Sequence, residues 1–569
     1  AWSDPGNCLI LAAGPMNGAR LPGTGTFTVV TKGPLTNGAS ASQANGYFGA
    51  YLKFSGFDAV VIQGQAKDWT YLYLHDGIAE LRDATSLVGK DTIETDEAIK
   101  KELGKREHGV SVFSIGPAGE NLVRFAAIVG DRGHVAGHNG MGAVMGSKKL
   151  KAVVADRSQG TVGVHDRRRL SELREVISKG IHADPATARW YTLGTKILYS
   201  LYEPQGLLPV KNATSALFPQ HASFTRPGYI DRVDLKPHRC WSCDHQSCNL
   251  LTIKEGPYAG FHGEEPDFEL MVAFGCLIGN LDVMAAITLN DEVDRLGLEG
   301  NESGWLMSWL IDCYERGYLT KKDTDGLDMT WGNVEAVRTM LRRIARRQGF
   351  GNLLAEGVKR ASQAVGGEAA QRAVYQQKGG APRGHDHRAR WTEILDVATS
   401  NTGTVESGVI IHPEQMGLPP FSDPFSPEQV AFFVAKGKGA WTLIDSLVMC
   451  LWTTGMQFPN IAELVKAATG WDFSVPEGLR VGERAINILR CFNLRHGITP
   501  DLEYPSPKYG SIPVDGPVKG KNIMAHWEQM LDQYYDLMGW DRKTGKPLPQ
   551  TLRSYGLDYA ILELWGLSS

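Results

Sequence analysis

The 569-residue sequence predicts an α+β protein, with a mostly-β N-terminal domain followed by two mainly α-helical domains. Up to about residue 155, short β-branched and aromatic runs are bounded by Gly and Pro, which is typical of strands. After residue 160, apolar residues recur at intervals of three and four, which is helical periodicity. Because a chain of this length is too long for a single core, we expect domains at residues 1–160, 161–372 and 373–569.

The individual elements follow from the same patterns. Strands are expected at residues 26–31, 59–63, 70–74 and 151–155, with a strand and turn at residues 9–14. A helix is expected at residues 92–103, because Asp91 is a good N-cap. Further helices are expected at residues 166–178, 292–298, 303–316, 334–347, 353–365, 427–438, 461–468, 481–494 and 526–539.

The composition excludes several classes of protein. Apolar residues make up 42% and charged residues 21% of the chain, which is ordinary for a soluble globular protein. The net charge of -4 provides no basic field for nucleic acid. No apolar run is long enough to span a bilayer, and no signal peptide is visible. Eight cysteines are few for a disulfide framework, so we expect a reducing, cytoplasmic setting.

Three cysteines fall within nine residues, in the segment Cys240-Trp-Ser-Cys243-Asp-His-Gln-Ser-Cys248. Thiolates this close together suit either a tetrahedral zinc site or one side of an iron–sulfur cluster. Zinc would need a nearby fourth ligand, which could be His238, His245 or His262. An iron–sulfur cluster could take its fourth cysteine from far along the chain. The local spacing leaves both possibilities open.

Two further patterns have alternative interpretations. Glycine-rich segments at residues 116–121 and 133–148 could let backbone N–H groups approach phosphate oxygens, or could simply form turns. The acidic run at residues 264–269 could be a solvated loop. However, an apolar run follows it at once, so Glu269 could be carried inward. Burial would then raise the pKa of Glu269 and make it a candidate proton carrier.

Several segments resemble the tungsten-containing aldehyde:ferredoxin oxidoreductase family. The resemblance runs through nearly the whole chain and is carried in the first domain by residues 31–36, 46–49, 52–58, 115–123 and 142–148. The chain begins at Ala1 without an initiator Met, and the family has further residues before this point. The resemblance therefore implies that the chain starts inside its first domain.

The resemblance implies a tungsten ion held by the dithiolenes of two pterin cofactors, with a 4Fe–4S cluster beside it. Cys240, Cys243 and Cys248 would be three cluster ligands, with one residue more between the last two than in the family. The fourth would be Cys450, which closes an apolar, helix-like stretch containing Asp445. There the family's Gly-Leu pair is replaced by Val-Met. Three of the other four cysteines, Cys276, Cys313 and Cys491, are expected to be buried apolar residues.

The same resemblance implies residues that contact the two pterins. The motif Asp294-Arg-Leu-Gly-Leu-Glu299 and a second group after residue 444 would bind the pterin rings, through Asp294, Gly297, Leu298, Glu299, Asp445 and Leu451. The first domain would contact the pterin phosphates and their bridging magnesium, through Gln43, Asn45, Gly46, Val135, Gly137, His138 and Gly140. Three arginines of the family are replaced, by Thr26, His134 and His138.

The family also implies two residues that handle protons near the tungsten. Glu269 matches the family's Glu, whereas Glu406 stands where the family has a His. The implied reaction is oxidation of a small aldehyde to a carboxylate, with electrons leaving through the cluster to ferredoxin or an iron–sulfur partner subunit. The residues that would carry it are Glu269 and Glu406, as proton carriers.

Two alternatives to aldehyde oxidation are considered. The first is a low-potential reductase of an acid or an aromatic acyl-CoA; relatives of that kind use an extra Cys, where this chain has Val272 and a displaced Cys276. The second is a zinc-stapled protein that is not an enzyme. The metal-binding ExxH motif of family dimers is absent near Asn290, so a homodimer would form without that metal.

Overall fold

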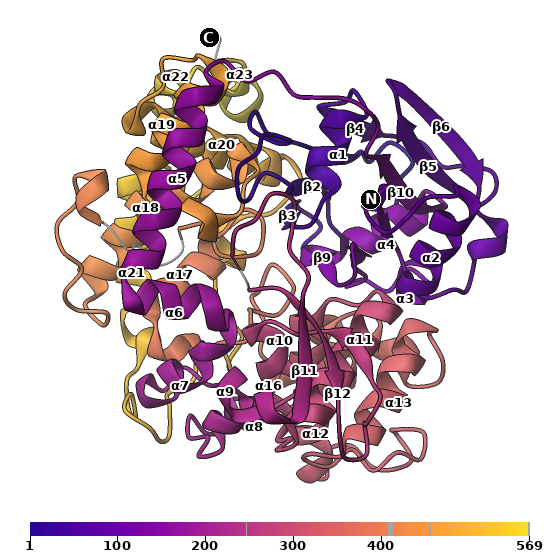
Figure 1. Ribbon diagram of the computed structural model, residues 1–569. Helices are drawn as coiled ribbons and strands as arrows, with labels where there is room; N and C mark the ends of the chain where they lie inside the picture. The colour runs from indigo at the N-terminus through magenta and orange to yellow at the C-terminus, as the bar shows by residue number, and fades with distance from the viewer. Residues whose placement is uncertain (246, 408–412, 455–456, 567–569) are drawn as a thin grey trace.

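The computed structural model describes residues 1–245, 247–407, 413–454 and 457–566. In Figure 1 the β-rich N-terminal part, coloured indigo to purple, lies beside a mainly helical remainder. This arrangement confirms the predicted fold class. The domain boundary at residue 372 stays a prediction; one apolar cluster includes residues on both sides of it, and it also reaches Leu35 and Phe125 of the N-terminal part.

The N-terminal part contains two sheets. The first has the strand order β3-β2-β1-β4, with all neighbours antiparallel: β1 Leu9–Ala12, β2 Phe27–Lys32, β3 Ala39–Ala44 and β4 Ala59–Ile62. The second has the order β6-β5-β10-β7-β8-β9: β5 Thr70–His75, β6 Ile78–Asp83, β7 Val110–Ser114, β8 Ile128–Gly130, β9 His134–Ala136 and β10 Leu150–Asp156. Helix α1 (Phe48–Phe54) contacts strands of both sheets, and its aromatic rings pack in their shared core.

The predicted strands are those with the strongest β-branched patterns. β10 is buried along its whole length, because it pairs with β5 on one side and β7 on the other. The predicted helix after Asp91 is α2 (Thr92–Glu102). Asp91 accepts a hydrogen bond from the backbone N–H of Glu94 at 2.7 Å, and Glu94 accepts one from Asp91, forming a capping box.

The helical part begins after residue 160. Its helices of eight or more residues are α5 Arg167–Ala183, α6 Pro185–Leu193, α11 Val283–Leu296, α12 Gly300–Glu315, α13 Val334–Ala345, α15 Val358–Val365, α17 Trp391–Thr399, α18 Pro427–Leu447, α19 Phe458–Thr469, α20 Val475–Arg495 and α21 Trp527–Met538. The shorter helices of the chain are α3 Pro117–Glu120, α4 Met141–Ser147, α7 Leu198–Tyr202, α8 Val210–Ala213, α9 Arg226–Tyr229, α10 Phe268–Ala273, α14 Gly351–Leu354, α16 Gly367–Gln371, α22 Pro549–Ser554 and α23 Tyr559–Trp565.

A three-stranded antiparallel sheet inside the helical part was not predicted. It has the order β11-β12-β13, with β11 Val233–Pro237, β12 Asn249–Ile253 and β13 His262–Glu264. Pro237 pairs with Asn249, and the backbone N–H of His238 bonds the carbonyl of Cys248 at 3.1 Å. The loop between β11 and β12 is therefore closed at its base, and it carries Cys240, Cys243 and Cys248 toward the N-terminal part (Figure 1).

The apolar stretch that ends at Cys450 looks helical in the sequence, but the helix stops before it reaches Cys450. α18 ends at Leu447, because Val448 adopts a left-handed conformation with φ 50°. Gly297 occupies the corresponding place at the end of α11, with φ 70°. The two sequence motifs, residues 294–299 and 445–450, thus each span the end of a helix. A β-branched residue is more strained in the left-handed conformation than glycine is.

Among the described residues, no single helix is both long and apolar enough to cross a membrane. One pair of helical segments, Phe268–Ile278 and Val283–Leu296, is together long and apolar enough, but the pair is bent by 118°.

Candidate metal and cofactor site

The four predicted cluster cysteines meet at the junction between the N-terminal part and the helical part. Burial and the nearby Cys248 thiol raise the pKa of Cys243 to about 11. Burial, with contributions from Cys243 and Cys248, raises the pKa of Cys450 to about 12. The Cys240 thiol also lies within hydrogen-bonding reach of Cys248 and close to Cys450. The hydrogen bond with Cys240 instead lowers the pKa of Cys248. Four thiols that influence one another's ionisation form a donor set that fits a positively charged metal centre.

Loops of the N-terminal part hold the cysteine loop in place. The backbone N–H of Trp241 donates to the Gly46 carbonyl at 3.0 Å, and its indole N–H donates to the Ala19 carbonyl at 3.1 Å. The backbone N–H of Cys450 donates to the Gly23 carbonyl at 3.1 Å. A Cβ atom on Gly25 would lie 2.1 Å from the Gly46 carbonyl oxygen, so glycine is required for this close approach.

The three histidines considered as zinc ligands make other contacts. His238 bonds the carbonyl of Asp131 at 3.0 Å, His245 stacks on Tyr191, and His262 on the outer strand β13 contacts Thr252 on β12. His134 instead lies beside the cysteines, with its Nε2 3.6 Å from the Cys240 Sγ. Burial lowers the pKa of His134 to about 3, so its ring is neutral next to the thiols.

A cavity of 240 Å³ opens beside the cysteine loop. The predicted residues that line it are Gln43, Asn45, Val135, Asp294 and Cys248. Its other polar lining residues include Glu264, Asp267 and Asp291, which sequence reasoning did not select individually. The cavity therefore brings together the predicted magnesium-side residues, one cluster cysteine and one predicted pterin-ring residue, all from separate parts of the chain.

Several carboxylates line the cavity, and few positively charged side chains lie close to them. Burial raises the pKa of Glu264 well above its usual value, and Cys248 and Asp294 raise it further. Burial and neighbouring carboxylates likewise raise the pKa of Asp294 and of Asp267, although Lys196 partly offsets the effect on Asp267. Such groups need hydrogen-bond donors or cations, which pterin ring N–H groups and a metal would supply. The donor set fits the cofactors implied by the resemblance.

The acidic run itself divides between two environments. Glu265 is fully buried and binds Arg226 and Tyr229, with Lys196 at 3.3 Å, so it fixes the loop. Glu264 instead lies against Gly133, whose added Cβ would overlap the Glu264 carboxylate. The sequence signal for the cavity was therefore present in the acidic run. Both glutamates line the cavity, but only the fold shows that Glu265 is held by ion pairs whereas Glu264 has none among the described residues.

The remaining predicted cofactor residues lie around this junction in several settings. Gln43 donates to the Asp445 carbonyl at 2.8 Å, which links β3 to the end of α18. Burial and Glu406 raise the pKa of Asp445 to about 7, yet its side chain still borders solvent-accessible space. Asn45 accepts a hydrogen bond from Thr26 at 2.8 Å. Asp445 itself is exposed, and it does not line the described cavity.

Other predicted cofactor residues already have structural roles. Glu299 caps α12 by accepting N–H groups of Asn301 and Glu302, and a Cβ on Gly137 would lie 3.1 Å from its Cγ. The buried ring of His138 has a lowered pKa because of desolvation, which the nearby Glu299 partly opposes. Gly46, Gly297 and Leu298 make backbone contacts between the N-terminal and helical parts. Gly140 packs within the N-terminal part, and Leu451 packs beside the end of α18.

Glu269 lies deep in the protein at the start of α10, where 26% of its side-chain surface remains accessible. Its predicted pKa shift is wrong in direction. Burial raises the pKa, but His385 at 3.5 Å and the nearby Arg383 outweigh burial, so the pKa of Glu269 is lowered. The prediction failed because these two residues are more than one hundred positions away and the sequence does not show their contact.

Glu406 lies in a buried ion-pair network. Its carboxylate is 3.0 Å from Lys438 Nζ and accepts the backbone N–H groups of Asn401 and Thr402 at 2.8 and 3.0 Å. Lys438 also binds Asp396 at 2.6 Å. Desolvation lowers the pKa of Lys438, but these two carboxylates outweigh it and raise the pKa overall. The network anchors the loop after α17 to α18.

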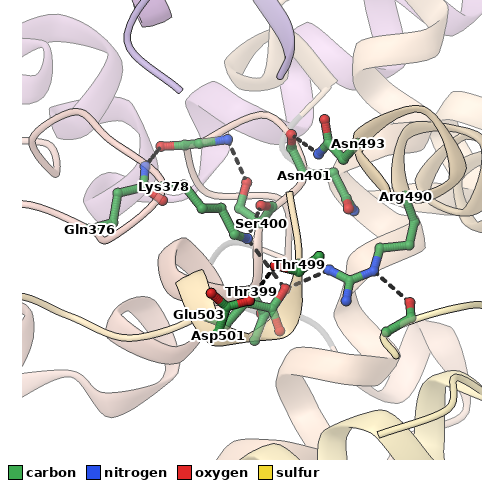
Figure 2. A network of polar contacts seen from close by, with 12 residues as sticks. Gln376, Lys378, Thr399, Ser400, Asn401, Arg490, Asn493, Thr499, Asp501 and Glu503 are labelled. Atoms are coloured by element: carbon green, nitrogen blue, oxygen red, sulfur yellow. Dashed lines mark hydrogen bonds and ion pairs between the residues drawn. The ribbon is translucent and has the colours of Figure 1, made fainter. Parts of the chain in front are cut away.

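A second network holds the same loop from the other side (Figure 2). Lys378 donates to the Ser400 carbonyl and lies 3.4 Å from Glu503, which also binds Arg490 at 2.5 Å. Burial lowers the pKa of Lys378 to about 8, although Glu503 opposes the shift. Asn493 donates to the Asn401 carbonyl at 2.7 Å. The loop is thus pinned by polar contacts that sequence reasoning did not identify.

Replacing Lys438 with Met is expected to destabilise the protein by about 3 to 5 kcal/mol, because Asp396 and Glu406 would then be buried without their cation. Chemical denaturation at neutral pH measures the effect. The matched control is Lys436→Met in the same helix, which is exposed and should change stability by less than about 0.5 kcal/mol. Equal stability of the two variants would contradict this account of the network.

The comparisons with known proteins agree with this geometry. Residues 1–157 match the family described as "Aldehyde ferredoxin oxidoreductase, N-terminal domain", and residues 172–557 match "Aldehyde ferredoxin oxidoreductase, domains 2 & 3". The chain is 35% identical over 562 residues to a tungsten-containing aldehyde ferredoxin oxidoreductase of Pyrococcus furiosus, covering 97% of this chain and 90% of that protein. It is 35% identical to the Thermococcus kodakarensis protein of the same name, covering 94% and 88%.

Two further similarities involve proteins with other names. An aliphatic sulfonate oxidoreductase, WOR-like subunit, of Pyrococcus furiosus is 31% identical, covering 98% of this chain and 89% of that protein. The solved active-site complex BamBC of benzoyl coenzyme A reductase with 1,5-dienoyl-CoA has a TM-score of 0.84 at 22% identity, covering 100% and 92%. The latter similarity is one of fold. Together with the two matched family regions, these findings show that the chain belongs to the aldehyde ferredoxin oxidoreductase family of oxidoreductases.

Proposed function

We propose that this protein oxidises an aldehyde to a carboxylate at a tungsten–bispterin centre and passes the electrons through a 4Fe–4S cluster. The single observation that carries the proposal is the gathering of four cysteine thiols beside a cavity lined by several carboxylates. Separate parts of the chain supply the two halves of this arrangement. The names of the relatives support the same reaction class.

The proposed ligands follow from the donor chemistry around the junction. Cys240, Cys243, Cys248 and Cys450 would hold the iron–sulfur cluster. Asp294, with Glu299 and Asp445, would accept N–H hydrogen bonds from the pterin rings. Gln43 and the carbonyl of Val135 would face a magnesium ion between the pterin phosphates. When bound, the tungsten centre would supply the Lewis-acid and two-electron redox chemistry.

The chain's own contribution is proton handling and positioning. Glu269 is proposed to take up and return the proton at the reacting carbon and water, because its carboxylate is ionised and accessible from inside. The assisting role of Glu406 stays a prediction. Because Lys438 and the loop N–H groups bind its carboxylate, we propose that Glu406 contributes mainly by fixing this loop.

The proposal includes the electron partner and the setting. The electrons would leave singly to ferredoxin or to a partner iron–sulfur subunit. The eight cysteines are all free, in agreement with the reducing cytoplasm that we propose. Any homodimer would form without an ExxH interface metal, because Thr288, Asn290 and Asp291 occupy that stretch.

Metal analysis with electron paramagnetic resonance on anaerobically purified protein tests the proposal. We expect about four iron atoms per chain, tungsten, and a signal from the reduced cluster. An aldehyde screen with ferredoxin or a viologen dye as acceptor should then show substrate-dependent reduction. Zinc alone, without iron or extractable pterin, would contradict the proposal and support the zinc-stapled alternative.

The reverse reaction, reduction of an acid or an aromatic acyl-CoA, is the second candidate. The fold similarity to the benzoyl coenzyme A reductase complex supports it only at the level of architecture. The buried Val272 offers no metal ligand, and Cys276 lies under the Tyr199 hydroxyl at 3.7 Å. Assays with low-potential reductant and acyl-CoA or acid substrates separate the two directions.

A further inference from the structure

A row of buried acid and imidazole groups leads away from Glu269 into the helical core. His385 Nε2 lies 3.5 Å from the Glu269 carboxylate, and His385 Nδ1 lies 3.4 Å from the Glu393 carboxylate. The same Glu393 oxygen is 2.9 Å from His387 Nε2. His387 Nδ1 in turn contacts the Tyr509 hydroxyl at 2.5 Å. Apart from Glu269, these side chains are almost fully buried.

The charges around this row favour proton exchange over a metal ion. The two histidines and Glu393 have ligand atoms close enough to bind a cation. However, the other oxygen of Glu393 already binds Arg390 at 2.7 Å and Arg383 at 3.0 Å. Two guanidinium groups on one carboxylate would repel a dication. The geometry therefore suits a monovalent proton better.

His385 has the geometry of a bridge between two carboxylates. Its two ring nitrogens each face one carboxylate, so a proton can enter at one nitrogen while another leaves from the opposite one. Distances of 3.4 to 3.5 Å are longer than those of formed hydrogen bonds, as is common for proton-transfer groups before substrate and cofactor are in place. Neither nitrogen has a closer hydrogen-bond partner among the described residues.

We propose that His385 exchanges protons with Glu269 and that Glu393 connects His385 to His387, the next acceptor in the row. The inference rests on the proposed function and names the proton route of that site. Oxidation of an aldehyde to a carboxylate takes oxygen from one water and releases three protons with two electrons. The electrons leave through the cluster, whereas the protons need a separate acceptor.

In this route each proton moves between named atoms. Glu269 accepts a proton, forming its O–H bond, and that bond breaks as His385 Nε2 gains the proton. The proton on His385 Nδ1 then passes to the Glu393 carboxylate, and from there to His387. The electrons and the substrate oxygen take no part in these transfers. His385 is a positioning and relay residue, since it acts through Glu269.

The groups facing the row come from several elements. Tyr202 on α7 and Phe268 on α10 place their rings 5.3 and 5.4 Å from the His385 ring. Burial would raise the pKa of Glu393, but Arg383 and His387 outweigh it and hold that pKa well below its usual range. These groups therefore keep Glu393 ionised, and burial lowers the pKa of His387, so a proton reaching either group stays there only in passing. Asp386 does not join the row, because it binds Arg388.

The first test is an infrared pH titration of the purified protein, with Glu269→Gln used to identify the carboxylic-acid band of Glu269. His385→Gln is expected to shift the midpoint of this band upward by about one pH unit or more, because a partner that favours the ionised form is lost. This readout does not depend on turnover. An unchanged midpoint would overturn the proposed contact, even if aldehyde oxidation is confirmed.

The second test is the pH profile of turnover. We expect His385→Gln to lower kcat by about 100-fold with KM changed far less, to alter the pH profile, and to leave iron and tungsten contents unchanged. The matched control is His221→Gln, whose Nδ1 contacts Ser200 away from this row. A normal kcat and pH profile in His385→Gln would overturn the relay. If the wild-type protein does not oxidise aldehydes at all, the proposed function is refuted instead.

A third arm covers the case in which His385→Gln folds poorly. His385→Gly should leave a gap that free imidazole can enter from the accessible side of Glu269, so added imidazole should restore part of kcat. His387→Gln should lower kcat less than His385→Gln, because it is one transfer further from Glu269. Imidazole that fails to restore a folded, metal-loaded His385→Gly variant would contradict the relay.

Discussion

Replacing Cys450 with serine is expected to abolish the reduced-cluster signal and aldehyde-dependent electron transfer. The thiol lies near enough to Cys240, Cys243 and Cys248 for mutual electrostatic influence, and a serine hydroxyl ionises too weakly to replace a thiolate at iron. Because Cys450 follows α18 whereas the other three cysteines lie on the β11–β12 loop, the proposed cluster would tie distant segments together, and the variant would lose that tie. Iron content, electron paramagnetic resonance and thermal stability should therefore all decrease together.

The matched control is Cys491→Ser. Cys491 lies on α20 and packs beside the C-terminal helices, away from the four clustered thiols. It should keep its iron, its cluster signal and its turnover. If Cys450→Ser retains a full complement of iron and normal turnover, the assignment of Cys450 as the fourth ligand is wrong.

Replacing Glu269 with Gln is expected to lower kcat by about 10² to 10⁴-fold, because Gln is nearly isosteric but accepts no proton at these pH values. Iron and tungsten contents should remain at wild-type levels, since Glu269 is not proposed to hold either centre. The lowered pKa of Glu269 means that its carboxylate is ionised at neutral pH and starts as the proton acceptor. Turnover should therefore fall when the pH drops below this lowered pKa and the carboxylate is protonated.

Steady-state kinetics with metal analysis on the same preparation measures this effect. Glu368→Gln, an exposed residue on α16, provides the control and should behave as the wild type. A Glu269→Gln enzyme with kcat within about twofold of wild type would exclude Glu269 as the proton carrier. Glu406→Gln would then become the next variant to measure, with its stability followed in parallel.

The sequence predicted best where local pattern and burial agree. β10 was located from its β-branched run, and α2 was located from its Asp91 cap; both are local signals that do not depend on distant residues. The start of α11 was placed too late, at residue 292, because its first turns are apolar on all sides and show no amphipathic period. The short strands β11 to β13 were missed because each is stabilised by pairing with its neighbours more than by composition.

At the site, the sequence by itself determined the chemistry available: the CxxC-type cysteine spacing, the acidic run, and the resemblance that pointed to Cys450 and Asp294. Only the tertiary structure decided which groups meet. The fold places His385 and Arg383 beside Glu269, which lowers the pKa of Glu269, and it places Lys438 beside Glu406. Electrostatic interactions fall off over a few ångströms, so they depend on neighbours in space, and those neighbours are separated by tens to hundreds of residues along this chain.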